Sequence, residues 1–474
     1  MSVNYRHRDI HRHRTRGALR LAFGVSVPVA VVAWVVGCGE PRSPVAVGSM
    51  PELTVEVAST ESVDLAGYFS DPAGDELSYA ASSSDAEVAT VAISGDAVAV
   101  TGVAFGSAEI TVTASDGSLS ASQDFTASVF TADRRVLNIL YDDLGGDGWT
   151  DNTNWKTDEP LDEWYGVSIN ADGRVDTLIL WDNSLTGEIP PELGSLSDLE
   201  VLILGVNYLT GEIPPELGSL PDLGGLSLYY NWLTGEIPPE LGDLSKLEYL
   251  DLGSNSLTGE IPSELGDLSS LEQLDLFANS LTGEIPPELG ELSNLDWLDL
   301  DVNSLTGEIP SELGSLWDLR GLFLQQNSLT GEIPPELGDL SSLEWLYLGS
   351  NSLTGEIPPE LGSLSNLRAL SLSENSLTGE IPSELGDLSN LEGLLLYGNS
   401  LTGEIPSELG SLSSLETLWL YSNSLTGEIP LDFLDLSSLK WFYWDDNEGL
   451  CAPDTTEFDN WLDGLAGWRG PRCD

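Results

Sequence analysis

The chain has 474 residues and carries 78 acidic against 17 basic side chains, a formal net charge of −61. Nucleic acid and anionic lipid surfaces are poor partners for so acidic a protein. All three histidines, His7, His11 and His13, lie near the N-terminus, and the remainder of the chain has none. Histidine-dependent nucleophilic catalysis and histidine metal sites are therefore excluded for the remainder.

Residues 1–37 have the pattern of a secretion signal: six arginines precede an apolar run over residues 21–36 that is short for a membrane span. The run ends in VVGC at Cys38, which resembles the lipobox of bacterial lipoproteins, whose cysteine is lipidated and becomes the new N-terminus. An uncleaved short anchor and a cleaved chain with a free Cys38 are the alternatives. Gly39, where Asp would be an inner-membrane retention signal, indicates an exported, lipid-anchored protein of the bacterial outer membrane or cell surface.

The chain has only three cysteines, Cys38, Cys451 and Cys473. If a lipid modifies Cys38, the other two are left to pair with each other in an oxidising compartment. The sequence therefore predicts a disulfide between Cys451 and Cys473 that holds the C-terminal end of the chain together.

Residues 38–50 are rich in Pro, Gly and small side chains, so we expect an extended linker. Residues 51–130 show short alternating or apolar runs between Gly, Asp and Ser turns, which is typical of a small all-β sandwich. With SDPAGDELSY and TASDG, this module resembles bacterial immunoglobulin-like or cadherin-like repeats. Such repeats often bind calcium, for which Asp71, Asp75 and Glu76 are the candidates. Because Ala73 interrupts the acidic motif, we favour a spacer role, with calcium binding as the alternative.

From residue 175 to residue 447 a unit of 24 residues repeats almost unchanged, as in LEYLDLGSNSLTGEIPSELGDLSS at 247–270. One Asn per unit marks the period, from Asn183 to Asn447, without insertion. The alternating Leu250 and Leu252 predict a short strand with one face inward, and no single unit can bury that face alone. The units must therefore stack into a repeat solenoid.

The motif LxxLxLxxNxLTGEIPxELGxLSx resembles the plant type of leucine-rich repeat. The resemblance implies an arc with a parallel sheet on its concave face and irregular or short helical segments behind. Twelve strands would form a face about 58 Å long. We expect the Asn side chains to bond backbone groups of the turns and to form a ladder along the core.

Both ends of a solenoid need caps, because the terminal coils expose their apolar cross-section. Residues 131–174 resemble the N-terminal cap of plant-type arrays, although Asp162 and Ile169 stand where that cap has a cysteine pair. Aromatic packing must then replace a disulfide. The apolar residues expected to close the first coil are Val136, Leu137, Leu140, Tyr141, Leu144, Trp149, Trp155 and Trp164. Residues 448–474 are the C-terminal cap, where Phe458, Trp461 and Leu465 predict an amphipathic helix.

The strand positions two, four and six residues before each Asn should face the concave side, and there the repeat varies most. Many of these positions are aromatic and suit a protein, peptide or glycan partner. The alternative is that the rings only pack on one another and shield the sheet. The candidates for binding through aromatic rings are Tyr249, Phe277, Trp297, Phe323, Trp345, Tyr347, Tyr397, Trp419 and Tyr421.

Three consecutive units carry Asp251, Asp275 and Asp299 at one strand position, and Asp301 follows. Parallel stacking would bring the first three carboxylates to about 5 Å, where like charges repel by about 3 kcal/mol at an effective dielectric near 20. A basic peptide or protein would relieve this repulsion, and a bound calcium ion is a second way to relieve it. If the side chains splay into solvent instead, they only add to the general acidity.

The sequence therefore predicts a surface-anchored recognition or adhesion protein that binds a protein or peptide on its concave face. A glycan stays open as the ligand. The alternative is a structural spacer of the cell envelope without a specific ligand. Because a regular array implies no deep pocket, we expect neither enzymatic activity nor a cofactor. A third hypothesis treats the repeated Thr258 and its equivalents as an ice-binding ladder.

Overall fold

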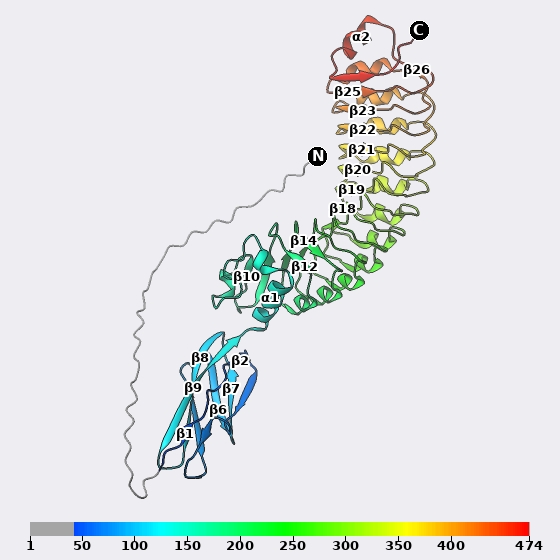
Figure 1. Cartoon of the computed structure of the whole chain (residues 1–474). Helices are drawn as coiled ribbons and strands as arrows, with labels where there is room; N and C mark the ends of the chain where they lie inside the picture. The colour runs from blue at the N-terminus through cyan, green and yellow to red at the C-terminus, as the bar shows by residue number, and fades with distance from the viewer. Residues whose placement is uncertain (1–41, 474) are drawn as a thin grey trace.

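The computed structural model describes residues 42–473, so the predicted signal peptide and Cys38 lie outside the described residues. A β-sandwich is followed by a long curved solenoid (Figure 1). Only Thr131 separates the last sandwich strand from the first helix of the solenoid, and its side chain caps that helix by accepting a hydrogen bond from the backbone N–H of Arg134.

The sandwich packs a four-stranded sheet, ordered β2-β9-β8-β5, against a three-stranded sheet, ordered β3-β7-β6. The short alternating or apolar runs of residues 51–130 form strands in this sandwich, as expected. Val45–Ala46 (β1), inside the predicted linker, pairs with Phe69–Ser70 (β4), so part of that linker belongs to the sandwich. The other strands are β2 (Leu53–Glu56), β3 (Thr60–Asp64), β5 (Ser78–Ser83), β6 (Ala89–Ser94), β7 (Ala97–Gly102), β8 (Gly106–Ser115) and β9 (Ser120–Phe130).

The solenoid is built on a sheet that has fourteen strands within residues 42–473. The twelve predicted repeat strands are present and pair in parallel with one another. One strand from each cap extends the sheet, antiparallel at the N-terminal end and parallel at the C-terminal end. In sheet order they are β10 (Val167–Ile169), β11 (Val175–Ile179), β13 (Val201–Ile203), β15 (Gly225–Ser227), β16 (Tyr249–Asp251), β17 (Gln273–Asp275), β18 (Trp297–Asp299), β19 (Gly321–Phe323), β20 (Trp345–Tyr347), β21 (Ala369–Ser371), β22 (Gly393–Leu395), β23 (Thr417–Trp419), β25 (Trp441–Tyr443) and β27 (Gly467–Arg469).

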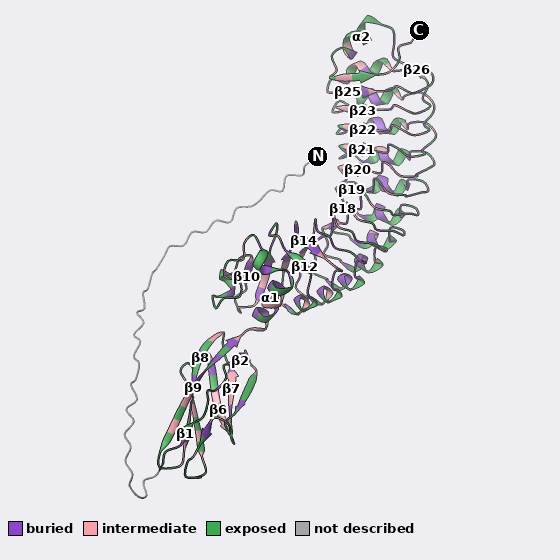
Figure 2. Ribbon diagram, in the orientation of Figure 1, coloured by how far each residue is buried: buried purple, intermediate pink, exposed green. Residues whose placement is uncertain are grey.

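The repeated leucines form one continuous core along the solenoid, visible as buried segments inside each coil (Figure 2). Leu250 and Leu252 are fully buried, as their equivalents are in other coils. The Asn ladder is confirmed: Nδ2 of Asn255 donates to the carbonyl oxygens of Leu228 and Leu252, both at 3.0 Å, and its Oδ1 accepts from the N–H of Leu233. Each Asn thus links consecutive coils and satisfies buried backbone groups.

Behind the sheet, each LTGEIP segment leads into a five-residue 3-10 helix that begins after a proline, which the fixed φ of proline favours. Short parallel pairs also form on this side: β12 (Thr186–Glu188) with β14 (Tyr208–Thr210), and β24 (Gly427–Glu428) with β26 (Leu450–Cys451). The 3-10 helices are η3 (Pro191–Ser195), η4 (Pro215–Ser219), η5 (Pro239–Asp243), η6 (Ser263–Asp267), η7 (Pro287–Glu291), η8 (Ser311–Ser315), η9 (Pro335–Asp339), η10 (Pro359–Ser363), η11 (Ser383–Asp387), η12 (Ser407–Ser411) and η13 (Leu431–Asp435).

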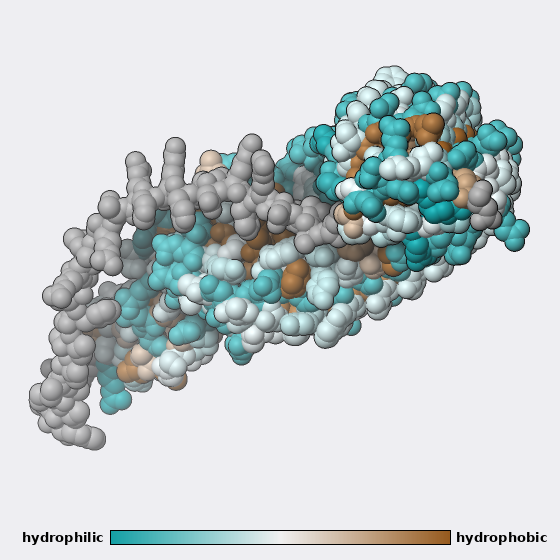
Figure 3. Space-filling model, turned by 90° about the horizontal axis from the view of Figure 1, so that it is seen from above, coloured by the Kyte–Doolittle hydropathy of each residue, from teal (hydrophilic) through white to brown (hydrophobic). Residues whose placement is uncertain are grey.

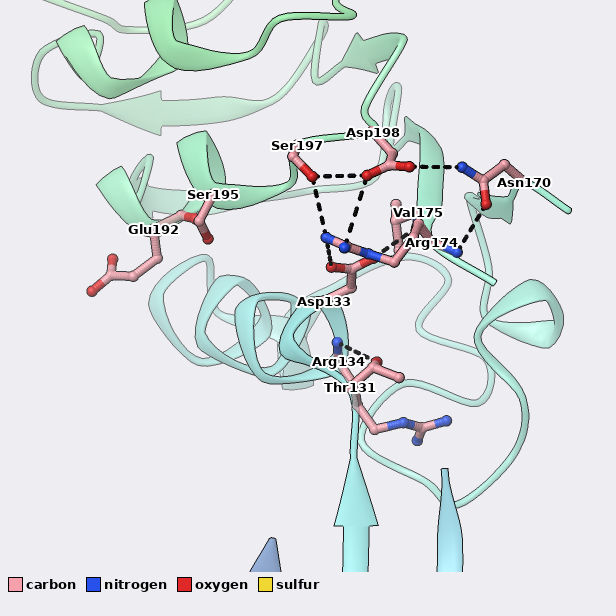
Figure 4. A network of polar contacts seen from close by, with 10 residues as sticks. All are labelled: Thr131, Asp133, Arg134, Asn170, Arg174, Val175, Glu192, Ser195, Ser197 and Asp198. Carbon is pink, nitrogen blue, oxygen red and sulfur yellow. Dashed lines mark hydrogen bonds and ion pairs between the residues drawn. The ribbon is translucent and has the colours of Figure 1, made fainter. Parts of the chain in front are cut away.

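The N-terminal cap consists of α1 (Ala132–Asp143), two short 3-10 turns, η1 (Gly146–Gly148) and η2 (Leu161–Glu163), and β10. Every apolar residue predicted to close the first coil is buried there. An ion pair that the sequence analysis missed adds to this closure (Figure 4). The guanidinium of Arg174 donates twice to the buried carboxylate of Asp133, at 2.8 and 2.9 Å, and the N–H of Val175 donates to the same carboxylate.

The C-terminal cap contains α2 (Thr456–Leu462), with Phe458 buried and Trp461 partly buried against the last coil. The predicted disulfide between Cys451 and Cys473 is present. It encloses α2 and β27, so the last strand of the sheet is held by a covalent loop. No helix within residues 42–473 is both long enough and apolar enough to cross a bilayer.

Candidate binding surface

The predicted column of carboxylates exists on the concave face. Asp251, Asp275 and Asp299 lie directly opposite one another on the consecutive parallel strands β16, β17 and β18. Ser227 precedes them in this row and Phe323 follows. We call Asp251, Asp275, Asp299 and Asp301 the acidic quartet.

The side chains of the quartet do not splay into solvent. Asp251 and Asp301 are buried, with 3% and 7% exposure, and the other two are half-buried. Asp251 accepts hydrogen bonds from the N–H of Gly253 and the hydroxyl of Tyr249, both at 3.0 Å. Asp301 accepts from the backbone N–H and the side-chain amide of Gln325. Neutral donors therefore hold these carboxylates in place.

Burial and mutual repulsion make the quartet hard to ionise. Burial raises the pKa of Asp251 to about 6. Burial is also the main reason that the pKa of Asp299 is raised, to about 6. It likewise raises the pKa of Asp301 to about 8, and the charge of Asp299 adds to that shift. The pKa of Asp275 is raised furthest, because its burial is combined with the charges of Asp251 and Asp299 on either side. Near neutral pH the quartet holds protons that isolated carboxyl groups would lose.

No basic side chain compensates these charges. None of the ion pairs within residues 42–473 includes a member of the quartet. Lys246 is the only basic residue from position 175 to position 319, and it pairs with Asp222. A cation on this part of the concave face would have to come from a partner.

The concave aromatic residues are less exposed than the sequence pattern suggests. Phe323 is buried, and the other aromatic candidates are half-buried. The rings lie across the sheet and pack on one another, as the 4.5 Å distance between the ring centres of Trp297 and Phe323 shows. Tyr397 and Tyr421 are stacked at the same distance. A Cβ on Gly253 would lie 2.7 Å from Phe277, so the glycine gives that ring room to lie flat. The rings thus both shield the sheet and form the surface that a partner would meet.

The structure brings the acidic quartet together with the rings of Tyr249, Phe277, Trp297 and Phe323. Tyr347 is more distant, but burial and the charge of Asp301 raise its pKa. Trp345 packs on Trp297, at 5.8 Å between ring centres. A separate aromatic cluster lies toward the C-terminal end and comprises Tyr397, Trp419, Tyr421 and Tyr443.

The calcium candidates of the sandwich do not converge on a metal site. Asp71 closes a turn instead: its Oδ1 accepts hydrogen bonds from the N–H groups of Ala73 and Asp75. Within residues 42–473 no three Asp, Glu, His or Cys side chains lie close enough to share a metal ion.

Sequence reasoning missed several polar and aromatic residues of this surface. Gln325 and Ser227 bond the quartet from neighbouring coils, which only the three-dimensional register reveals. Tyr208, Tyr230 and Trp232 are more exposed than the predicted concave rings, at 49%, 58% and 59%. The signal that could have found Tyr208 and Trp232 is their departure from the Ser that most units carry after the Asn.

Family comparisons agree with this architecture. Residues 46–125 match the family described as bacterial Ig-like domain, group 2. Leucine rich repeat families match residues 234–281 and eight further segments between residues 174 and 436. The solenoid is a leucine-rich repeat array. No curated protein sequence matches the chain.

Several solved structures resemble this one. The complex PEPR1–AtPEP1 is 31% identical with a TM-score of 0.57, and the match covers 72% of this chain and 55% of that one. The Arabidopsis receptor kinase HAESA, solved with the peptide hormone IDA and the co-receptor SERK1, is 32% identical with a TM-score of 0.56, covering 68% and 58%. The match to this chain thus spans little more than half the length of either protein. A plant ice-binding protein is 27% identical with a TM-score of 0.51, covering 72% and 97%.

Proposed function

We propose that this protein is a non-enzymatic recognition or adhesion protein that binds a basic protein or peptide segment on the concave face, centred on the acidic quartet. The observation that carries the proposal is the row Asp251, Asp275 and Asp299: three in-register carboxylates, one buried and two half-buried, with no basic residue beside them. Burying like charges costs stability, and a Lys or Arg side chain from a partner would offset that cost. Leucine-rich repeat and Ig-like domains are typical interaction folds, and the peptide-bound HAESA structure supports a peptide as partner.

The flanking rings suit the aliphatic stems of such a partner. Phe277 and Trp297 lie one coil apart beside the quartet, and a guanidinium or ammonium group over an aromatic face gains about 0.5–2 kcal/mol. Because most of the attraction is electrostatic, association should weaken as salt concentration rises.

The test uses two labelled synthetic peptides of equal length, one alternating Arg and Leu and the other alternating Glu and Leu, with binding followed by fluorescence anisotropy. The triple variant Asp251→Asn, Asp275→Asn, Asp299→Asn should weaken binding of the Arg peptide at least tenfold. Its matched control removes three exposed GEIP carboxylates: Glu260→Gln, Glu284→Gln, Glu308→Gln. Equal losses in both variants would mean that bulk charge alone attracts the peptide and that the quartet is no site.

We infer further that the protein is exported and anchored by a lipid on Cys38. The arginine-rich apolar segment, the sequence VVGC and the disulfide of the C-terminal cap support this inference. Cys38→Ser should move the protein from the membrane fraction into the soluble fraction, whereas Cys451→Ser should leave it in the membrane fraction. Membrane retention of the Cys38→Ser protein would contradict lipid anchoring.

Two other functions have specific observations in their favour. The continuous core and the two caps would also serve a structural spacer of the cell envelope, and failure of every concave-face variant to change cell or peptide binding would favour it. The exposed Thr column and the similar plant ice-binding protein favour ice binding. However, the hydroxyl of Thr258 already donates to the carbonyl of Gly235, as its equivalents do in neighbouring coils. Absence of thermal hysteresis would exclude ice binding.

A further inference from the structure

A second aromatic surface lies on the N-terminal coils, where the chain turns from the concave strand into the LTGEIP segment. In nine of the twelve units the residue after the ladder Asn is Ser, but Tyr208 and Trp232 occupy this position in two consecutive coils. Their rings lie 5.3 Å apart. Tyr230 precedes the Asn of the same unit as Trp232 and is also more than half exposed.

Of these side chains, Tyr230 contacts an aromatic ring of the concave face. The ring centre of Tyr230 lies 5.8 Å from that of Tyr229, which stacks on Trp181 at 5.9 Å. Trp181 itself is 41% exposed. We call Trp181, Tyr208, Tyr229, Tyr230 and Trp232 the rim patch. Hydrophilic and intermediate residues cover most of the face shown in Figure 3, with apolar residues between them. An exposed aromatic group of this size is a candidate contact surface.

The fold does not require aromatic residues at the two rim positions. The N–H of Trp232 donates to the carbonyl of Leu209 at 2.9 Å, and Ser256 makes the equivalent bond to Leu233 at 2.8 Å. The backbone is therefore the same with Ser as with Trp. Leaving large rings in water gains nothing for folding, whereas Tyr and Trp are the side chains that most often carry binding energy at protein interfaces.

The charges around the rim patch define its partner. The neighbouring LTGE segments present the exposed carboxylates of Glu188, Glu212 and Glu236, and Asp182 is exposed in the first coil. The one basic residue among these coils and the next, Lys246, is already paired with Asp222. A second copy of a chain with net charge −61 would be repelled, so a basic protein surface is the complementary occupant.

We propose that the rim patch is a docking surface for a basic protein partner, whose apolar side chains and Arg or Lys stems lie on the rings while their charges face the LTGE carboxylates. This surface occupies the first three coils, outside the acidic quartet on the following coils. The proposal therefore does not depend on the function proposed for the concave face.

The test selects a phage-displayed library of random dodecapeptides on the immobilised full chain and depletes it on the variant Tyr208→Ser, Trp232→Ser, which restores the residue of the other units. Peptides that survive should be rich in Lys, Arg and apolar residues. Measured by fluorescence anisotropy, their Kd should rise at least tenfold in the double variant and less than twofold in Trp317→Ser. Trp317 is 70% exposed at a position where most other units carry Ser, so it controls for the loss of any surface Trp.

Several outcomes would overturn the proposal: no peptide that distinguishes wild type from the double variant, enriched peptides that are neutral or acidic, or a wild-type dimer that the double variant converts to a monomer. Binding of a glycan array that depends on Tyr208 and Trp232, without peptide binding, would also overturn it. The Asn triple variant of the acidic quartet separates the two surfaces, because rim-specific peptides should bind it with less than threefold loss.

Discussion

Asp275 lies directly opposite Asp299 on the adjacent parallel strand, and neither carboxylate has a basic partner within the described residues 42–473. On its other side Asp275 faces Asp251, so it is the middle member of a row of like charges. Its raised pKa means that the folded protein holds a proton there which the unfolded chain would release.

The first prediction is that folding stability falls as pH rises. The unfolded carboxyl groups lose protons near pH 4, while those of the folded quartet keep them up to pH 6 or above. Between these values the folded state binds more protons, so the free energy of unfolding decreases with increasing pH. Asp275→Asn removes part of this penalty and should stabilise the protein at pH 9 by about 1–3 kcal/mol, with a smaller effect at pH 5.

Melting temperatures at pH 5, 7 and 9 measure this effect. Glu260→Gln is the control, because this exposed carboxylate lies in the LTGEIP segment. If Asp275→Asn and Glu260→Gln change the melting temperature equally at every pH, ionisation of the row Asp251, Asp275 and Asp299 does not lower folding stability.

The repeat architecture could be predicted from the sequence because it depends on local spacing. The strand leucines, the Asn ladder and the apolar face of α1 recur with fixed periods, and each was found where the pattern placed it. The burial of Asp251 and Asp301 could not be predicted, since it depends on how the coils pack. Their partners Ser227 and Gln325 come from neighbouring coils. Tyr208, Tyr230 and Trp232 of the rim patch were missed for a different reason: they lie outside the strand positions that face the concave side.

The second prediction concerns the residue before each ladder Asn, which adopts a left-handed conformation in all twelve coils. Only Gly398 is a glycine there, and Val302 holds φ at +56°. A β-branched residue is strained in this region, which costs about 1–2 kcal/mol. Val302→Gly should therefore raise the free energy of unfolding by about 1 kcal/mol, and Gly398→Val should lower it by a similar amount. Denaturant unfolding of both variants measures the effect; a destabilising Val302→Gly would show that no strain is relieved.

The third prediction concerns the C-terminal cap. The disulfide between Cys451 and Cys473 closes a loop with a sequence separation of 22, worth about 3 kcal/mol in the chain-entropy model. The double change Cys451→Ser, Cys473→Ser should loosen α2 and β27 first. In a solenoid each coil contacts only its neighbours, so the loss of stability should stay near the C-terminal end. Hydrogen exchange should speed up in residues 441–473 and stay unchanged in residues 175–300. Uniform acceleration along the solenoid would contradict a local role for the bond.

The last prediction concerns the joint between the sandwich and the solenoid. The guanidinium of Arg134 lies 3.9 Å from the ring centre of Phe105, in the loop before β8, and 4.9 Å from that of Trp164 in the cap. It also donates to the carbonyl oxygens of Thr157 and Glu159. One cation thus contacts both domains, and it lines a cleft of about 620 Å³ formed by residues of both.

Phe105→Ala removes the sandwich side of this contact and leaves every hydrogen bond of Arg134 in place. We expect melting temperatures within about 2 °C of wild type, since the ring is half-buried at the domain edge. The distribution of distances between the two domains, measured by paired spin labels on Ser62 and Ser197, should broaden, because a single residue, Thr131, would then hold their angle. Phe125→Ala, which opens the core of the sandwich, is the contrast: it should lower the melting temperature. An unchanged distance distribution in Phe105→Ala would mean that the β9–α1 connection alone fixes the joint.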